Sequence, residues 1–207
     1  RNGGMVVKSR YPADGTLFCE KWESEQKHGI WEWVKNRIYY RLPEEIRRDV
    51  ADAEIVLYYG WQCCRLRGFK IDEDRIDLPC DPSMYHAPEC NFVFENMPRS
   101  YLQSGQWSPD PENGILYYRP LKGEKKEDAV FFTGGAEKLL ILDGVENLTF
   151  EGITFRHTGD DTIRNSHQGD HLGSGAVELR DAKNCVFRNC RFESLSCWGA
   201  DLLAGST

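Results

Sequence analysis

A repeat in the last third of the chain is the sequence feature that most constrains the fold. Residues 140–155, LILDGVENLTFEGITF, align with residues 177–192, VELRDAKNCVFRNCRF, at a constant offset of 37. The matched positions include one asparagine pair and two phenylalanine pairs: Asn147 with Asn184, Phe150 with Phe187, and Phe155 with Phe192. Each copy contains short runs of alternating apolar and polar residues, which are typical of half-buried strands. One such copy cannot bury its inner face alone, so the pattern predicts stacked copies.

Turn residues separate the short strands within each copy. In the first copy, glycine or asparagine stands at Gly144, Asn147 and Gly152, where the chain must bend sharply. Three strands joined by bends form one turn of a coil, and like residues of successive turns then lie about 4.8 Å apart. The repeat therefore predicts an all-β fold whose copies wind in parallel.

A third copy begins near Trp198. At an offset of 23 from the second copy, Ala200 and Leu202 take the inward positions of Val177 and Leu179. An offset of 24 would instead turn Asp201 inward, and burying an unpaired carboxylate is costly, so 23 is favoured. The larger first offset leaves 14 additional residues, which we expect to form a loop within residues 157–174.

The first two thirds of the chain have a different pattern. Pro43 and the acids after it predict a short helix near residues 43–50. Short strands are predicted at 53–61, 64–71, 75–78, 91–95, 115–119 and 129–132, with a strong turn signal at 110–114. We therefore expect a connecting segment over 1–46, a β-sandwich-like subdomain over 47–133, and the coil over 134–207.

Two further motifs carry a resemblance to a known family. FENM at 94–97 and GQWSPDPENGILYYRPL at 105–121, followed by the repeat at 140–157, resemble a segment of large right-handed parallel β-helix proteins of carbohydrate metabolism. Over about residues 45–207 the chain is similar to glycoside hydrolase family 141 and, more loosely, to family 120. The resemblance implies the first coils of a right-handed parallel β-helix with a β-sandwich inserted beside it. Ser108 departs from the pattern, because an acidic or aromatic residue often follows the tryptophan.

Two carboxylates are candidates for glycoside cleavage. At the favoured offset, Glu178 and Asp201 point outward from one sheet on neighbouring strands. Their separation would be near the strand spacing, within the range of about 5–5.5 Å that retaining glycosidases use. Two like charges so close would raise one pKa, as a general acid requires. The alternative interpretation is that both acids only make the surface soluble.

Other candidate residues would contact the sugar. Trp198, just before Asp201, is the best candidate for an aromatic platform under a sugar ring. The loop carries side chains suited to acid–base work, to a hard cation, or to sugar hydroxyls: Asp160, Asp161, His167, Asp170 and His171. The alternative is a polar surface loop, and His157 is interpreted as a turn residue. We expect no structural metal and no cofactor.

Three functions compete on these observations. A glycoside hydrolase is favoured by the architecture and the paired acids. A polysaccharide lyase would need Ca²⁺ and a basic residue facing a uronate, for which Arg156, Arg180 and Arg191 are available. A non-catalytic carbohydrate-binding or surface protein is the third, since a coil with side loops can simply hold a ligand.

Charge and composition limit the partners. The chain has 33 acidic and 26 basic residues, a formal charge of −7, which disfavours nucleic acid as a partner. No apolar run approaches the ~20 residues that span a bilayer. The start at Arg1, without a signal region, and an end within a repeat indicate a piece of a longer protein. We expect a carbohydrate substrate and an extracellular or periplasmic location.

The eight cysteines leave the redox state open. They would permit a disulfide framework in a secreted chain, but their spacings match no zinc pattern. Cys80 and Cys90 bracket a proline-containing segment and can be bridged; the alternative is that they are free thiols or small core residues.

Overall fold

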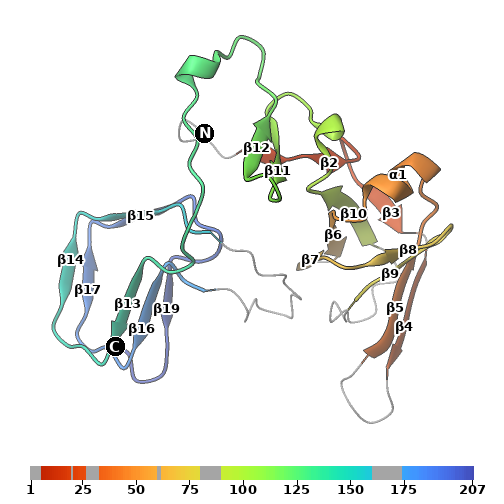
Figure 1. Cartoon of the computed structure of the whole chain (residues 1–207). Helices are drawn as coiled ribbons and strands as arrows, with labels where there is room; N and C mark the ends of the chain where they lie inside the picture. The colour runs from red at the N-terminus through yellow and green to blue at the C-terminus, as the bar shows by residue number, and fades with distance from the viewer. Residues whose placement is uncertain (1–5, 20, 27–32, 60–61, 80–89, 160–173) are drawn as a thin grey trace. The chain divides into compact units, whose positions relative to one another are not determined.

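The computed structural model describes residues 6–19, 21–26, 33–59, 62–79, 90–159 and 174–207 (Figure 1). Within them the chain is all-β, with one α-helix and two short 3-10 helices. The chain divides into two compact units, of which one contains residues 6–129 and the other contains residues 130–159 and 174–207. Most strand pairs are antiparallel, and the parallel pairs lie mainly in the second unit.

The second unit contains the repeat. Its strands are β13 (Leu140–Asp143), β14 (Thr149–Glu151), β15 (Thr154–Arg156), β16 (Val177–Arg180), β17 (Val186–Arg188), β18 (Arg191–Glu193) and β19 (Ala200–Leu202). They form three parallel sheets, β13-β16-β19, β14-β17 and β15-β18, which appear as adjacent strands in Figure 1. Leu142 pairs with Leu179 and Phe150 with Phe187, so the predicted pairing at an offset of 37 is confirmed. Leu179 in turn pairs with Leu202, which confirms the offset of 23.

The bends of the two copies coincide as well. At four positions of the first copy, and at the matching four of the second, the backbone φ is positive, a region that glycine and asparagine enter most readily. The matched pairs are Gly144 (62°) with Asp181 (45°), Asn147 (61°) with Asn184 (52°), Gly152 (69°) with Asn189 (54°), and His157 (62°) with Ser194 (52°). The predicted turn role of His157 is therefore confirmed.

Like side chains stack along the repeat. The rings of Phe150 and Phe187 are parallel to within 14° with centroids 4.9 Å apart, close to the strand spacing. Asn184 Nδ2 donates a hydrogen bond to Asn147 Oδ1 at 3.3 Å. A small core of buried side chains fills the inner face: Leu142, Phe155, Val177, Leu179 and Ala182. Each copy thus supplies the apolar surface that the other needs.

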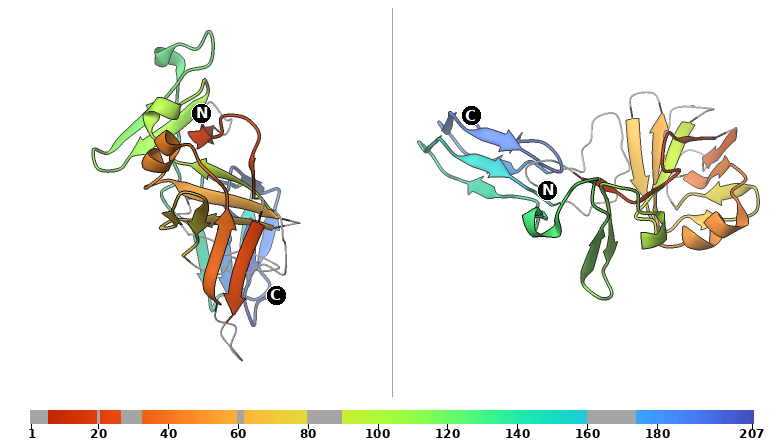
Figure 2. Two further views of the ribbon diagram at one scale, coloured as in Figure 1. Left: turned by 90° about the vertical axis from the view of Figure 1, so that its right-hand side faces the viewer. Right: turned by 90° about the horizontal axis from the view of Figure 1, so that it is seen from above.

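The described strands of the first unit form three sheets. Its strands are β1 (Val7–Lys8), β2 (Arg10–Tyr11), β3 (Leu17–Cys19), β4 (Lys21–Gln26), β5 (Trp33–Tyr39), β6 (Glu54–Tyr59), β7 (Gln62–Leu66), β8 (Lys70–Ile71), β9 (Arg75–Asp77), β10 (Cys90–Glu95), β11 (Gln106–Asp110) and β12 (Ile115–Tyr118). The sheet orders are β2-β10-β6-β7 with β3 also on β10, β4-β5-β9-β8, and β1-β11-β12. Figure 2 shows β4 and β5, in red to orange, as a long antiparallel pair.

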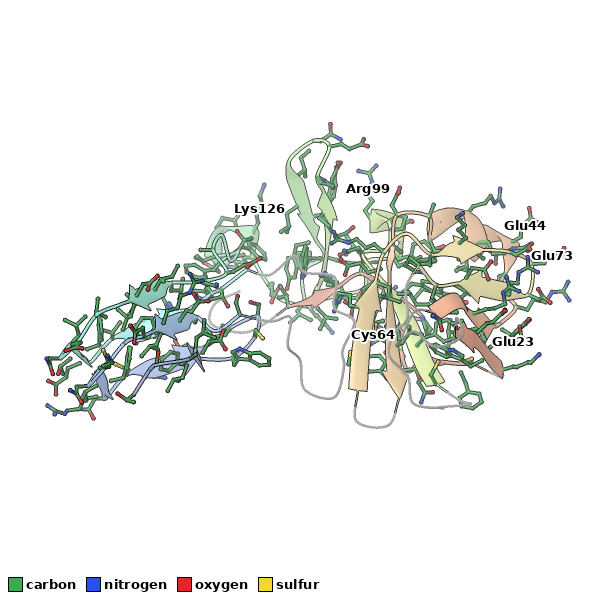
Figure 3. The ribbon with its side chains drawn as sticks, turned by 90° about the horizontal axis from the view of Figure 1, so that it is seen from below. Glu23, Glu44, Cys64, Glu73, Arg99 and Lys126 are labelled. Atoms are coloured by element: carbon green, nitrogen blue, oxygen red, sulfur yellow. The ribbon has the colours of Figure 1, made fainter. Side chains whose placement is uncertain are left out.

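Helix α1 (Glu44–Asp49) connects two of these sheets in sequence. It follows Pro43, has two acids in its first turn and two arginines in its last, and buries Ile46. The 3-10 helices η1 (Arg99–Tyr101) and η2 (Lys126–Asp128) are single short turns. Figure 3 shows Glu44 of α1, Glu23 of β4 and Glu73 on the outside of this unit.

Two segments of the chain differ from the sequence-based prediction. The segment 1–46, interpreted as a connection, contributes β1 to β5, whose polar alternating residues gave a weak strand signal. The strand predicted at 129–132 is not formed: these residues belong to no strand, and Val130, Phe131 and Phe132 are exposed. The turn at Asp110–Gly114 is confirmed as the hairpin bend between β11 and β12.

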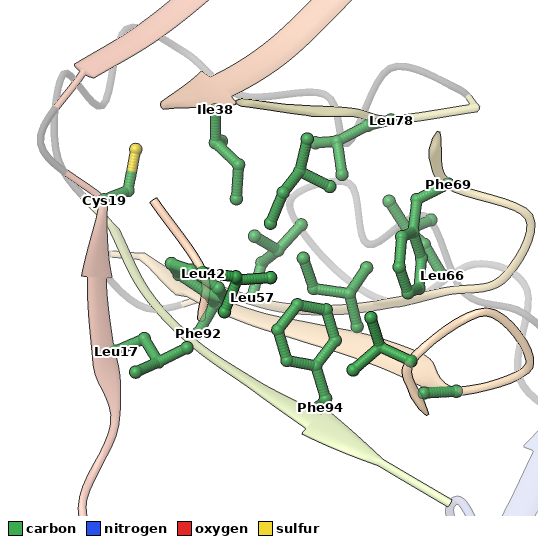
Figure 4. Packing of buried hydrophobic residues seen from close by; sticks show 14 of the residues in the cluster. Leu17, Cys19, Ile38, Leu42, Leu57, Leu66, Phe69, Leu78, Phe92 and Phe94 are labelled. Atoms are coloured by element: carbon green, nitrogen blue, oxygen red, sulfur yellow. The ribbon is translucent and has the colours of Figure 1, made fainter. Parts of the chain in front are cut away.

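One hydrophobic cluster takes side chains from both larger sheets of the first unit. It includes Leu17 and Cys19 of β3, Ile38 of β5, Leu57 of β6, Ile76 of β9, and Phe92 and Phe94 of β10 (Figure 4). The rings of Phe92 and Phe94 are perpendicular, with centroids 5.8 Å apart. Because two antiparallel sheets share this cluster, it is the main apolar stabilisation of residues 6–129.

A buried carboxylate lies on β6 of the same unit. Glu54 of β6 is 1% exposed and accepts hydrogen bonds from Lys8, Arg65 and Arg67. Burial alone would raise the pKa of Glu54, but these cations outweigh burial and lower its pKa to about 2. The first unit therefore holds an ionised carboxylate in its interior at neutral pH.

Candidate functional site

Glu178 and Asp201 occupy matching positions on neighbouring parallel strands. Glu178 of β16 pairs directly with Asp201 of β19. Glu178 alternates with Val177 and Leu179, which belong to the small core, so its side chain projects from the opposite face of the strand. The register favoured from the sequence thus places the two acidic residues side by side on neighbouring strands.

The surroundings of Glu178 differ from the expected solvated surface. Glu178 is only 4% exposed, because two cations cover its carboxylate. Lys138 Nζ contacts Oε2, and Arg180 Nη2 lies 2.5 Å from Oε1. Lys138 precedes β13, and Arg180 is two residues along β16, on the same side as Glu178. The expectation that this acid is turned toward solvent is therefore wrong.

The pKa of Glu178 also departs from expectation. The hydrogen bond from Lys138 lowers this pKa below its usual range, and the charge of Arg180 adds to the effect against the opposing cost of burial. Glu178 is therefore not the acid of the pair with the raised pKa that the sequence predicts for one of them, because the two nearby cations lower its pKa. Glu178 is suited to act as an ionised carboxylate and poorly suited to donate a proton.

Asp201 is held by the backbone of the preceding copy. Its Oδ2 accepts a hydrogen bond from the Gly175 N–H at 2.6 Å. A Cβ at Gly175 would lie 2.6 Å from the Asp201 nitrogen, so only glycine permits this approach of the two chain segments. This contact fixes the start of β19 against the segment that leads into β16.

The remaining predicted sugar contacts divide into two groups. The Trp198 side chain is 38% exposed, three residues before Asp201, and its carbonyl oxygen accepts the Ala176 N–H at 3.0 Å. Its ring is accessible from solvent. The five predicted loop residues lie outside the residues that the structure describes: Asp160, Asp161, His167, Asp170 and His171.

The residues at the ends of this loop are described. The ring of His157 stacks on Phe132, with centroids 4.9 Å apart and planes within 2°. Thr158 Oγ1 accepts the Ser196 N–H at 2.8 Å, which ties the end of the first copy to the second. The start of the loop is thereby fixed on the repeat.

The arginines considered for a lyase are all paired with acids. Arg180 is engaged by Glu178, and Arg156 and Arg191 both approach Glu193, at 3.8 Å and 3.1 Å. Each therefore has part of its charge compensated by a carboxylate of the chain. This arrangement weakens the case for an arginine that faces a uronate.

The described part of the chain shows neither a metal site nor a membrane span. There, no three His, Cys, Asp or Glu side chains are grouped closely enough to hold a metal ion. None of the helices in the same residues has the length and apolar character needed to cross a bilayer.

Sequence reasoning missed both partners of Glu178. Arg180 was detectable, because residues two apart on a strand share a face. Lys138 lies 40 positions from Glu178 and comes close only because β13 pairs with β16, and no local pattern marks it.

One comparison with known proteins found a similar fold. No protein-family model matches the sequence, and the search of curated proteins found no match. A solved structure of a protein named "Glycoside hydrolase" superimposes with a TM-score of 0.65 at 20% sequence identity. The match covers 97% of this chain and 43% of that one, so this chain spans less than half the length of the solved protein. At this identity the likeness is one of fold.

Proposed function

We propose that this chain is part of a right-handed parallel β-helix protein that hydrolyses glycosidic bonds, related to glycoside hydrolase family 141 or 120. The parallel register that places Glu178 opposite Asp201 is the observation that carries the proposal. The likeness of fold to a protein named "Glycoside hydrolase" supports the carbohydrate class by analogy. In this view the coil begins near residue 134, and residues 47–133, with the strands before them, are the inserted β-sandwich.

The two carboxylates would take different roles. Glycosidases with two acids use one as proton donor and one as an ionised nucleophile or base. Lys138 and Arg180 keep Glu178 ionised, which assigns it the second role and leaves Asp201 as the proton donor. Directly paired strand residues lie about 4.8 Å apart, near the separation of retaining enzymes.

Access to Glu178 depends on the two cations that cover it. The side chain of Lys138 is 27% exposed and that of Arg180 is 48% exposed, so both are partly solvated and end in flexible chains. A sugar would replace their contacts to the outer face of Glu178. Trp198 would supply an aromatic surface for a sugar ring beside Asp201.

The test is hydrolysis of a panel of aryl glycosides and plant or microbial polysaccharides by the chain and its variants. Glu178→Gln and Asp201→Asn should each lower kcat at least about a hundredfold, the usual contribution of an acid–base group. Glu151→Gln and Asp143→Asn, exposed acids of the same repeat, should retain activity. Hydrolysis unchanged in both site variants would refute the assignment.

A second measurement separates catalysis from stability. If Glu178 is a nucleophile, added azide should restore turnover of an activated aryl glycoside by Glu178→Ala and give a glycosyl azide. If Glu178 only holds Lys138 and Arg180, its replacement lowers the unfolding midpoint, and azide restores nothing.

A non-catalytic carbohydrate-binding protein is the second candidate. The burial of Glu178 between two cations favours it, because such an arrangement also serves stability alone. Binding of an oligosaccharide that depends on Trp198, without release of sugar, would support this function. Either function fits an extracellular or periplasmic location, which we propose for the protein.

A further inference from the structure

Cys19 and Cys90 face each other across two strands of the first unit. Cys19 of β3 pairs directly with Cys90 of β10 in antiparallel register, next to the pair of Leu17 and Phe92. The alternate residue Phe18 is exposed, whereas both cysteines are buried in the hydrophobic cluster, at 0% and 2% exposure. Both thiols therefore project from the same face of the sheet, and Figure 4 shows Cys19 at the edge of that cluster.

This placement matches the geometry of a disulfide. Directly opposed residues of antiparallel strands have Cα atoms about 4.5–5.5 Å apart, and disulfides span Cα separations of about 4.4–6.8 Å. The strand pairing therefore already provides a Cα separation that a disulfide can span. The strand register thus selects one partner for Cys90, at a position far away in sequence.

The two thiols already interact. The neighbouring Cys90 thiol lowers the pKa of the Cys19 thiol, and the same contact together with burial raises the pKa of the Cys90 thiol. The Cys19 thiol also donates to the Lys21 carbonyl, with 3.1 Å between sulfur and oxygen. Cys19 is therefore the thiol that ionises first.

We propose that Cys19 and Cys90 form a disulfide when the chain folds in the presence of a disulfide oxidant such as glutathione disulfide, before the hydrophobic cluster covers both thiols. The Cys19 thiolate attacks the oxidant, forming a mixed disulfide and releasing one thiol. The Cys90 thiolate then attacks the Cys19 sulfur and releases the second thiol, so two protein thiols are oxidised while one disulfide is reduced to two thiols. Cys80, the alternative partner from sequence spacing, lies outside the described residues.

The bridge would link distant parts of the first unit. It closes a loop of roughly 70 residues, for which loop-closure entropy gives roughly a thousandfold decrease in the unfolding equilibrium constant. It would also fasten the short strand β3 to the central strand β10.

Non-reducing peptide mapping of the whole chain tests the proposal. The reduced, unfolded protein is refolded in the presence of glutathione disulfide, remaining thiols are alkylated in denaturant, and the digest is analysed by mass spectrometry with and without reductant. We expect a cross-linked peptide pair containing Cys19 and Cys90 that disappears on reduction. Oxidation should raise the urea midpoint of the wild type and of the exposed-cysteine control Cys63→Ala, but should leave that of Cys19→Ala unchanged.

Two outcomes would overturn the proposal. One is a cross-link between Cys90 and Cys80 in place of Cys19. The other is alkylation of both Cys19 and Cys90 after folding and oxidation. Mapping of the unmodified chain decides between these results even if Cys19→Ala fails to fold.

Discussion

Replacing Glu54 by glutamine perturbs the one carboxylate that the described part of the first unit buries among three cations. Glu54 Oε2 lies 2.9 Å from Lys8 Nζ and 2.5 Å from Arg65 Nη1, and Arg67 Nε lies 2.9 Å from Oε1. Arg65 also contacts Glu95 at 2.5 Å, so Arg65 keeps an acidic partner after the substitution. Glutamine retains the shape of the side chain and removes its charge.

The expected effect follows from the pKa of Glu54. Its folded value of about 2 lies below the ordinary value of 4.5, and the difference corresponds to about 3 kcal/mol at about 1.36 kcal/mol per pKa unit. Because the folded pKa is the lower one, this stability is present above pH 4.5 and is lost as pH falls toward 2. About 2 kcal/mol of it should be gone between pH 6 and pH 3.

Urea unfolding at pH 6, 4 and 3 measures this contribution. The free energy of unfolding of wild type should exceed that of Glu54→Gln most at pH 6, and the gap should narrow by about 2 kcal/mol at pH 3. Glu112→Gln, at an exposed position of the β11–β12 turn, should show a gap within about 0.5 kcal/mol at every pH. A difference in free energy of unfolding between wild type and Glu54→Gln that stays constant as pH falls would contradict this prediction.

Two further predictions concern the repeat. Gly175→Ala should destabilise the second unit by about 1–3 kcal/mol in thermal unfolding, because the new Cβ would lie 2.6 Å from the Asp201 nitrogen. The control Gly135→Ala should leave the stability unchanged, because a Cβ at residue 135 meets no atom within 4 Å. Asn184→Ala should cost about 1–2 kcal/mol, because alanine tolerates a φ of 52° poorly and the bond to Asn147 is lost. Asn184→Gly should recover the backbone part of that cost in urea unfolding, and an equal loss in both variants would contradict the role assigned to φ.

The repeat was predictable because its physics is local. The strand alternation, the bend residues and the matched phenylalanines recur at one spacing, and parallel stacking follows from the need to bury each copy's inner face. The cost of burying Asp201 also selected the correct offset of 23 for the third copy. These arguments require only residues that are close in sequence or repeated at a fixed spacing.

The surroundings of the candidate site were not predictable in the same way. The alternation of the strand predicts that Glu178 lies on the outer face, but its burial depends on Lys138, which lies in the segment before β13. The strands β1 to β5 were missed for a similar reason. Strands β1, β2, β3 and β5 pair with β9, β10 or β11, which are distant in sequence, and tertiary contacts override weak propensity there.

The two offsets of the repeat have a consequence for how such a protein can diversify. Asn147 and Phe155 match their counterparts at the same spacing of 37, so all extra length between the first two copies lies after residue 156 and before residue 177. Lengthening or exchanging that connection leaves the register of the paired strands unchanged, because hydrogen bonds of Thr158 and Gly175 fix its two ends on the repeat. New recognition properties could therefore be grafted there while the scaffold stays untouched.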